Sequence, residues 1–126
     1  MKKEKFEITR SSGKKTVEGY IYKGFGITKD KYVSEWQWEA TILKSGLKIA
    51  DAPTRKLLLH KLDTVLELVP DFATLDSTGQ REEMRKALPD NMPLHLFAHW
   101  LYPSMLDGGC TGRTTWDQFK KTQKHV

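Results

Sequence analysis

The spacing of hydrophobic residues changes once along this chain, near residue 52, and this change limits the fold more than any other feature of the sequence. Between Trp36 and Ile42 every second residue is apolar, which is the period of a β-strand with one buried face. From Leu58 to Val69 the apolar residues recur at helical spacing, along one stripe. A strand followed by an amphipathic helix predicts a sheet that the helix covers.

The N-terminal half of the chain predicts an antiparallel sheet of three or four strands. Residues 5–10 and 16–24 alternate apolar and polar side chains around a glycine-containing turn, which is typical of a hairpin. Residues 24–28 should continue the second strand after a bend, because glycine weakens regular strand pairing. Residues 32–43 form the next expected strand, and residues 47–51 form a short last one.

The C-terminal half predicts one long helix followed by two or three shorter ones. The long helix spans residues 53–69, with Pro53 in its first turn and Asp51 or Ala52 as its cap. His60 is expected near the rim of this helix, as a surface residue. The shorter helices should lie within residues 77–88, 93–102 and 115–123.

Two of the shorter helices begin with a recognisable capping signal. Ser77 precedes Gln80 by three residues, and Thr115 precedes Gln118 by the same interval. This is the spacing of a capping box, in which the two side chains bind backbone groups of the first helical turn.

Length and composition indicate one domain with a true core, since the chain has 126 residues and 38% of them are hydrophobic. We therefore predict a single α+β domain over residues 1–126, with a ββββα unit at 1–69 and a helical extension at 70–126. A single cysteine excludes an intramolecular disulfide and fits a reducing compartment. No apolar run approaches the roughly 18 residues of a membrane span. The basic N-terminus also lacks the apolar segment of a secretory signal, so we expect the cytoplasm of a bacterial host cell.

The formal net charge of +5 is concentrated near the N-terminus. Residues 1–29 contain eight Lys or Arg and three Asp or Glu, so the predicted hairpin is basic. Such a surface suits phosphates or an acidic partner, and it is equally typical of a solvated face that keeps a small domain in solution. The candidate nucleic-acid-binding residues are Lys2, Lys3, Lys14, Lys15, Lys23 and Lys29.

Two features resemble catalytic or metal sites without completing one. His95 and His99 lie one helical turn apart and could share a metal ion, but the residue after His95 is Leu96 and not the glutamate of a metalloprotease helix. Cys110 lies in a glycine-rich loop near Arg113, which would favour a thiolate, but the sequence shows no orienting residue or oxyanion site. We therefore predict no catalytic residue, no metal site and no cofactor.

The segment from "YIYKGFGI" through "WQWEATI" to "PTRKLLLHKLD", about residues 18–66, resembles small accessory proteins of tailed phages and prophages. In those proteins a Y-x-G-x-x-I hairpin leads to a helix that opens with threonine. Residues 92–109 also resemble a helix of the lambdoid phage inhibitor of the host recombination nuclease. The shared residues there are Pro93, His95, Leu96, Phe97 and Gly109.

The order of strands and helix is similar to a second group of proteins. "WEATI" followed by a short strand and "PTRKLLLHKLD" resembles the plan of AP2-type and phage-integrase arm-type DNA-binding domains. The resemblance implies that the sheet face opposite the helix would meet the major groove. Glu35, Gln37 and Glu39 would lie on that face and would meet phosphates with the wrong sign.

These observations favour a non-enzymatic accessory protein of phage or mobile-element type that binds and modulates a protein partner. A host defence factor or a nucleic-acid-processing factor would be an example of such a partner. The alternative is a small nucleic-acid-binding domain that uses the basic N-terminal hairpin. Aromatic side chains would anchor a protein partner, and the candidates are Tyr20, Tyr22, Trp36, Trp38, Trp100 and Trp116.

Overall fold

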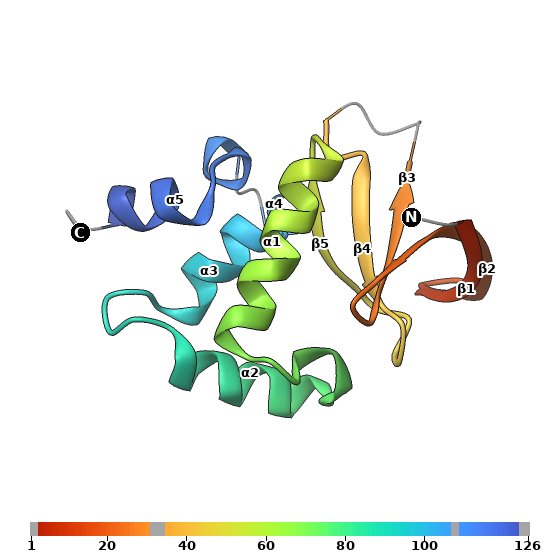
Figure 1. Ribbon diagram of the computed structural model, residues 1–126, viewed down its shortest axis with the longest axis horizontal. Helices are drawn as coiled ribbons and strands as arrows, with labels where there is room; N and C mark the ends of the chain where they lie inside the picture. Colours follow the sequence, from red (N-terminus) through yellow and green to blue (C-terminus); the bar gives the residue numbers. More distant parts are fainter. Residues whose placement is uncertain (1–2, 31–34, 107–108, 124–126) are drawn as a thin grey trace.

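A computed structural model describes residues 3–30, 35–106 and 109–123, and it shows an α+β fold in which helices pack on one side of an antiparallel sheet (Figure 1). The five strands are β1 (Lys3–Arg10), β2 (Gly13–Tyr22), β3 (Phe25–Lys29), β4 (Trp38–Ile42) and β5 (Lys48–Ala52), and they pair in sequence order. The α-helices of the described residues are α1 (Arg55–Leu68), α2 (Ser77–Ala87), α3 (Leu94–Leu101), α4 (Pro103–Leu106) and α5 (Trp116–Gln123). Two short 3-10 helices are η1 (Phe72–Thr74) and η2 (Gly109–Arg113).

The α+β class and the antiparallel pairing are confirmed, and the sheet has five strands, one more than the predicted three or four. Residues 24–28 do not continue the second strand, because Lys23 and Gly24 turn the chain with φ angles of 51° and 91°. Positive φ at both central residues defines a two-residue hairpin turn of the kind that matches strand twist. β3 therefore returns antiparallel to β2, with Phe25 opposite Tyr22.

β4 is shorter than the strand predicted at residues 32–43. It begins at Trp38, so Glu35 and Trp36 precede the sheet, while residues 31–34 lie outside the described part of the chain. The alternation of the sequence nevertheless holds within β4. Ala40 and Ile42 face α1 in the core, and Glu39 lies on the opposite face.

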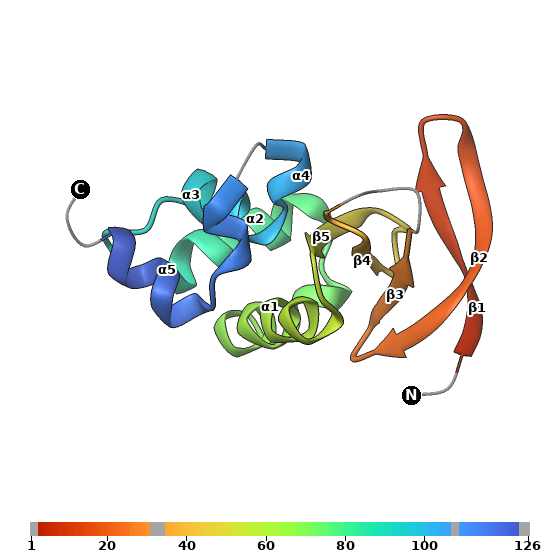
Figure 2. The same cartoon turned by 90° about the horizontal axis from the view of Figure 1, so that it is seen from above.

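The sheet is strongly curved. Gly19 and Gly26 lie at points of close approach within it, where a Cβ would clash with a neighbouring atom. The ring of Phe6 lies directly over Gly26, where an ideal Cβ would come within 2.3 Å of it. The curve brings β1 to the turn between β4 and β5, where the Thr9 amide donates to the Gly46 carbonyl at 2.7 Å. Figure 2 shows the β1–β2 hairpin standing at an angle to the rest of the sheet.

Helix α1 covers the sheet with the predicted stripe, of which Leu58, Leu62 and Val65 are fully buried. Its cap is Thr54, whose hydroxyl oxygen accepts from the Leu57 amide at 3.2 Å. The predicted caps, Asp51 and Ala52, lie instead inside β5, because the strand runs almost to the helix.

The capping predictions for the shorter helices differ in outcome. At α5 the capping box is confirmed: the Thr115 amide donates to Gln118 Oε1 at 3.0 Å, and the Gln118 amide donates back to the Thr115 hydroxyl at 3.4 Å. At α2 it is wrong, since Asp76 caps the helix by accepting from the Gly79 amide at 2.7 Å. Gln80 turns inward and donates to the Phe72 carbonyl at 3.0 Å.

The helical C-terminal half packs on the first half through one continuous hydrophobic cluster. At its centre Trp100 is wholly buried, and its indole N–H donates to the Thr114 carbonyl at 2.8 Å. Phe97, Trp116 and Phe119 surround it with ring centroids 5.3 to 6.0 Å away. The two halves of the chain therefore share a core.

The close approach of the β3 backbone to Gly19 of β2 gives a test of how tightly these strands pack. An ideal Cβ at Gly19 would lie 2.1 Å from the Ile27 carbonyl oxygen, which is backbone and cannot rotate away. We expect Gly19→Ala to lower the free energy of unfolding by about 3 kcal/mol, because strands β2 and β3 must separate to admit the methyl group. Urea denaturation measures this effect. Thr16→Ala, at an exposed position of the same strand, is the control and should change it by less than about 0.5 kcal/mol.

Candidate functional site

A cluster of charges around two buried carboxylates lies where β5, an edge strand of the sheet, meets the helices. The Asp51 carboxylate is fully buried and pairs with Lys48 Nζ at 3.0 Å. It also accepts from the hydroxyl of Ser104 and, at 3.4 Å, from the Ser104 amide at the start of α4. Lys48 reaches a second buried carboxylate, that of Glu39 on β4, at 2.9 Å. One lysine thus holds two carboxylates, and one carboxylate holds the start of a helix.

Lys48 stays charged in this cluster. Burial by itself would lower the pKa of Lys48, but the hydrogen bond to Glu39 and the charges of Asp51 and Glu39 outweigh burial and raise the pKa above its ordinary value. The side chain therefore carries a firm positive charge at neutral pH, next to the ring of Tyr102, whose centroid is 4.8 Å from Nζ.

Lys61 on α1 is the most unusual titratable group of the described residues. Its side chain is fully buried, and Nζ donates to the Asp51 backbone carbonyl at 2.9 Å. The ammonium group also lies 5.5 Å from the ring centroid of Trp100 and 5.7 Å from that of Trp36. Burial lowers the pKa of Lys61 to about 7, against the opposing charge of Asp51. Lys61 therefore joins α1 to the edge of the sheet at the expense of burying a cation.

His60 is not the simple surface residue that the sequence suggested. Its ring is half-buried, and Nε2 accepts from the Trp116 amide at 3.0 Å. It also meets Trp100 edge to face, with centroids 6.1 Å apart. No sequence pattern could predict this contact, because the two partners are 56 residues apart in the chain.

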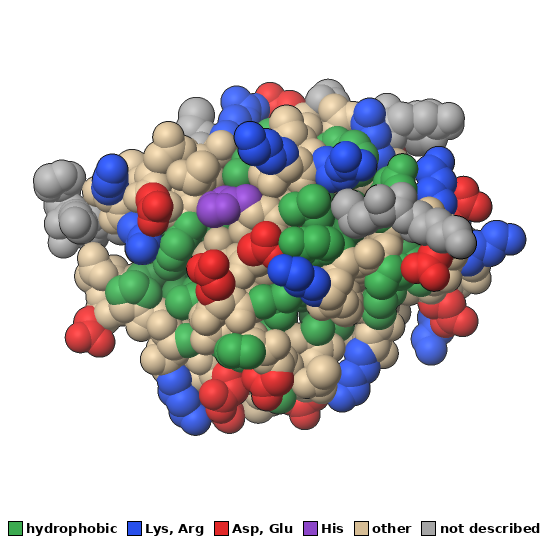
Figure 3. Space-filling model, viewed as in Figure 1, with side chains coloured by type: hydrophobic (Ala, Val, Ile, Leu, Met, Phe, Trp, Pro, Cys, Tyr) green, Lys and Arg blue, Asp and Glu red, His purple; other side chains and the backbone are tan. Residues whose placement is uncertain are grey.

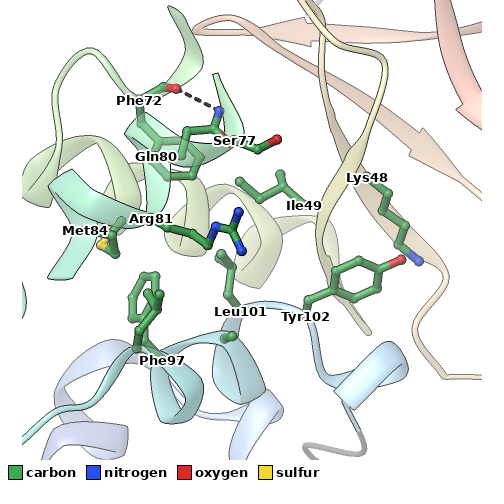
Figure 4. Close-up of a pocket in the computed structure, with 12 residues that line it drawn as sticks. Lys48, Ile49, Phe72, Ser77, Gln80, Arg81, Met84, Phe97, Leu101 and Tyr102 are labelled. Atoms are coloured by element: carbon green, nitrogen blue, oxygen red, sulfur yellow. Dashed lines mark hydrogen bonds between the residues drawn. The ribbon is translucent and has the colours of Figure 1, made fainter. Parts of the chain in front are cut away.

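A pocket of about 380 Å³ opens beside this cluster, between β5, α2 and α3 (Figure 4). Its walls are largely apolar and come from Ile49, Phe72, Met84, Phe97 and Leu101. Polar groups border it, and they belong to Lys48, Ser77, Gln80, Arg81 and Tyr102. An apolar hollow with a few convergent polar groups is the usual form of a binding site in a small protein.

Arg81 is the polar group of the pocket that is best placed to meet a ligand. It is exposed on α2, and its guanidinium group extends across the pocket in the direction of Leu101 (Figure 4). Among the described residues it has no ion-pair partner. Gln80, one residue earlier, is by contrast bound to Phe72 and helps to shape the wall.

The structure does not gather the predicted nucleic-acid-binding lysines into one surface. Lys14 and Lys15 are neighbours on β2, so their side chains leave opposite faces of the hairpin. Lys23 pairs with Asp63 of α1 at 3.1 Å. Lys3 and Lys29 are exposed at the ends of β1 and β3, and Lys2 lies outside the described residues.

The aromatic candidates for partner binding divide into two kinds. Trp100 is wholly buried and offers no surface to a partner. The others are half-buried, and they are Tyr20, Tyr22, Trp36, Trp38 and Trp116. Tyr22 is also engaged, since its hydroxyl donates to Asp63 at 2.7 Å.

No metal site forms within the described residues, where no three potential ligands come together. His95 is exposed and His99 is half-buried on α3. The side chain of Cys110 lies outside the described part of the chain.

Comparisons of this chain with protein-family models, with curated proteins and with solved structures found no match. Within the described ranges, no helix has both the length and the apolar character required to cross a membrane.

The contacts of Asp51 predict a large loss of stability when its carboxylate is replaced by an amide of the same size. Asp51→Asn should lower the free energy of unfolding by about 3 kcal/mol, because it leaves the buried Lys61 and the partly buried Lys48 with less opposing charge. Chemical denaturation at neutral pH measures the loss. Asp63→Asn is the matched control, since it breaks the largely exposed pair with Lys23 and should cost less than about 1 kcal/mol. Equal losses in the two variants would contradict the structural role of Asp51.

Lys61 predicts a pH dependence that a neutral residue abolishes. The folded pKa of about 7 lies below the ordinary value of 10.5, so the unfolded state binds the extra proton between these pH values. Stability should therefore rise with pH across this window and should fall as pH drops toward 7, where the buried cation carries its full penalty. The free energy of unfolding should rise by about 3 to 5 kcal/mol across this window, since each unit of pKa difference contributes about 1.4 kcal/mol. Lys61→Met should remove this rise.

The measurement is the difference between wild type and Lys61→Met in urea denaturation from pH 7 to 10. Taking the difference removes the contribution of the tyrosines and the other lysines. Lys56→Met, an exposed position of the same helix, should run parallel to the wild type. If the free energy of unfolding of Lys61→Met changes with pH as that of the wild type does, the pKa of Lys61 does not change on folding, and the prediction is contradicted.

Proposed function

We propose that this chain is a non-enzymatic accessory protein of phage or mobile-element type that binds and modulates a protein partner in the bacterial cytoplasm. The observation that supports this proposal is the apolar pocket between β5, α2 and α3, bordered by Arg81, which forms no ion pair with another described residue. A host defence factor or a nucleic-acid-processing factor is the class of partner we propose.

The chemistry around the pocket favours binding over catalysis. Lys48 is held charged by two carboxylates, and burial raises the pKa of Tyr102 above its ordinary value. Both groups therefore keep their protons at neutral pH, and neither acts as a general base. The hydroxyl of Tyr102 can instead act as a donor to a bound group, while Lys48 stays engaged with Glu39 and Asp51.

The pocket suits an apolar side chain of a partner that is followed by a carboxylate. Its volume of about 380 Å³ is near the lower end of the range of ligand-sized sites. Met84, Phe97 and Leu101 would desolvate the apolar group, and burial of such an anchor supplies most of the affinity in many interfaces. The carboxylate would meet Arg81, whose planar donors bind carboxylates in pairs.

The test is recovery of a partner that depends on the pocket. Tagged wild-type protein and its variants are incubated with lysate of the host, and captured proteins are identified by mass spectrometry. Ala98→Phe should abolish capture, because the ring fills the pocket from α3. Arg81→Glu should weaken the purified complex at least tenfold in calorimetry, because it reverses the charge that meets the carboxylate.

The matched control is Lys86→Glu, which makes the same charge change on α2 at a residue that does not line the pocket. It should capture the partner as the wild type does. All variants should keep the wild-type melting temperature within a few degrees. Capture that survives both pocket variants would contradict the proposal, and so would the absence of any captured protein.

A further inference from the structure

A second surface lies at the N-terminal end of α1, where cations and aromatic rings alternate. Trp38 and Lys29 are direct partners in the β3–β4 ladder, and Lys29 Nζ lies 5.5 Å from the centroid of Trp38. Arg55, the first residue of α1, holds its guanidinium carbon 5.9 Å from the centroids of both Trp38 and Tyr20. Lys3 is the ladder partner of Tyr20 and so lies on the same face.

We call these five residues, Lys3, Tyr20, Lys29, Trp38 and Arg55, the cation–aromatic face. Figure 3 shows Lys and Arg side chains beside hydrophobic ones over the end of α1 that adjoins the sheet. The face combines two residues from the basic hairpin prediction with two from the aromatic prediction. Arg55 is the member that sequence reasoning missed, because a lone arginine at a helix start carries no signal of its own.

The cations of this face are not neutralised within the described part of the protein. Lys3, Lys29 and Arg55 form no ion pair there, whereas Lys23, Lys86 and Lys120 each pair with a carboxylate at 3.1 to 3.5 Å. Three exposed cations attract a polyanion, and none of the ion pairs recorded among the described residues has to break when it binds.

The aromatic rings indicate which polyanion fits. A single strand of nucleic acid offers phosphates and unpaired bases in alternation, and its bases stack on aromatic and guanidinium planes. A duplex hides the faces of its bases, and an acidic peptide has no flat rings at every step. Tyr20 and Trp38 are half-buried, so they stay in position while part of each ring remains accessible.

We propose that the cation–aromatic face binds single-stranded nucleic acid, with Lys3, Lys29 and Arg55 on phosphates and with Trp38 and Tyr20 against bases. The face shares no residue with the pocket between β5, α2 and α3. Binding of nucleic acid at this face does not depend on binding of a protein partner at the pocket, and each can be tested separately.

The test is fluorescence anisotropy of a labelled oligothymidylate of roughly 15 nucleotides, titrated with the protein over a range of salt concentrations. Three phosphate contacts predict that the logarithm of the association constant falls with the logarithm of salt with a slope of about −2. Arg55→Gln should make this slope shallower by about 0.7, and Arg55→Lys should restore it. Lys86→Gln, the same loss of charge on α2, should leave the slope unchanged.

Loss of the aromatic ring has a different signature. Trp38→Leu should lower the affinity roughly tenfold at every salt concentration and should leave the slope as in the wild type, because stacking is not ionic. Far-UV circular dichroism and the melting temperature check that each variant is folded. If Trp38→Leu is unfolded, Tyr20→Leu serves as the aromatic test with the same expected signature.

Three outcomes would overturn the proposal. The first is no binding at the lowest salt concentration. The second is an equal effect of Arg55→Gln and Lys86→Gln, which would indicate attraction by net charge alone. The third is equal or tighter binding of a duplex of the same length, or equally effective competition by polyglutamate, either of which would assign the face to another class of ligand.

Discussion

The contacts of Asp51 are those on which the arrangement of sheet and helices depends. Its carboxylate holds Lys48 and the start of α4 at Ser104, while its backbone carbonyl accepts from Lys61 of α1. One residue of an edge strand thereby links β5 to two helices that are far apart in sequence. A buried carboxylate is tolerated there because cations and hydrogen-bond donors surround it.

The position of the pocket depends on these contacts of Asp51. Ile49 and Lys48 of β5 form one side of it, and Tyr102 immediately precedes the helix that Asp51 holds. β5 contacts both α1 and α4, so two helices hold the strand that forms this wall of the pocket. A preformed wall reduces the entropy lost on binding, which is consistent with the binding role proposed for the site.

The two proposed surfaces lie on different parts of the molecule and have different chemistry. The pocket is largely apolar and bordered by Arg81, whereas the cation–aromatic face lies at an end of the sheet and of α1 and carries three exposed cations. If both proposals hold, the protein can contact a nucleic acid and a protein partner at once. Such an arrangement suits a small protein that modulates a nucleic-acid-processing factor on its substrate.

The sequence by itself determined the α+β class, the helix α1 and the cap at Thr115, because these follow from local periodicity and local hydrogen bonds. Local rules failed at Lys23 and Gly24, whose positive φ angles make a hairpin turn where the glycine pattern predicts only a bend. Only the tertiary structure decided the candidate sites. Lys61, buried against Asp51, and Arg55, placed over two rings, gain their roles from residues on other elements. The burial and electrostatic field that set a side chain's chemistry come from such distant neighbours, and the spacing of residues along the chain does not record them.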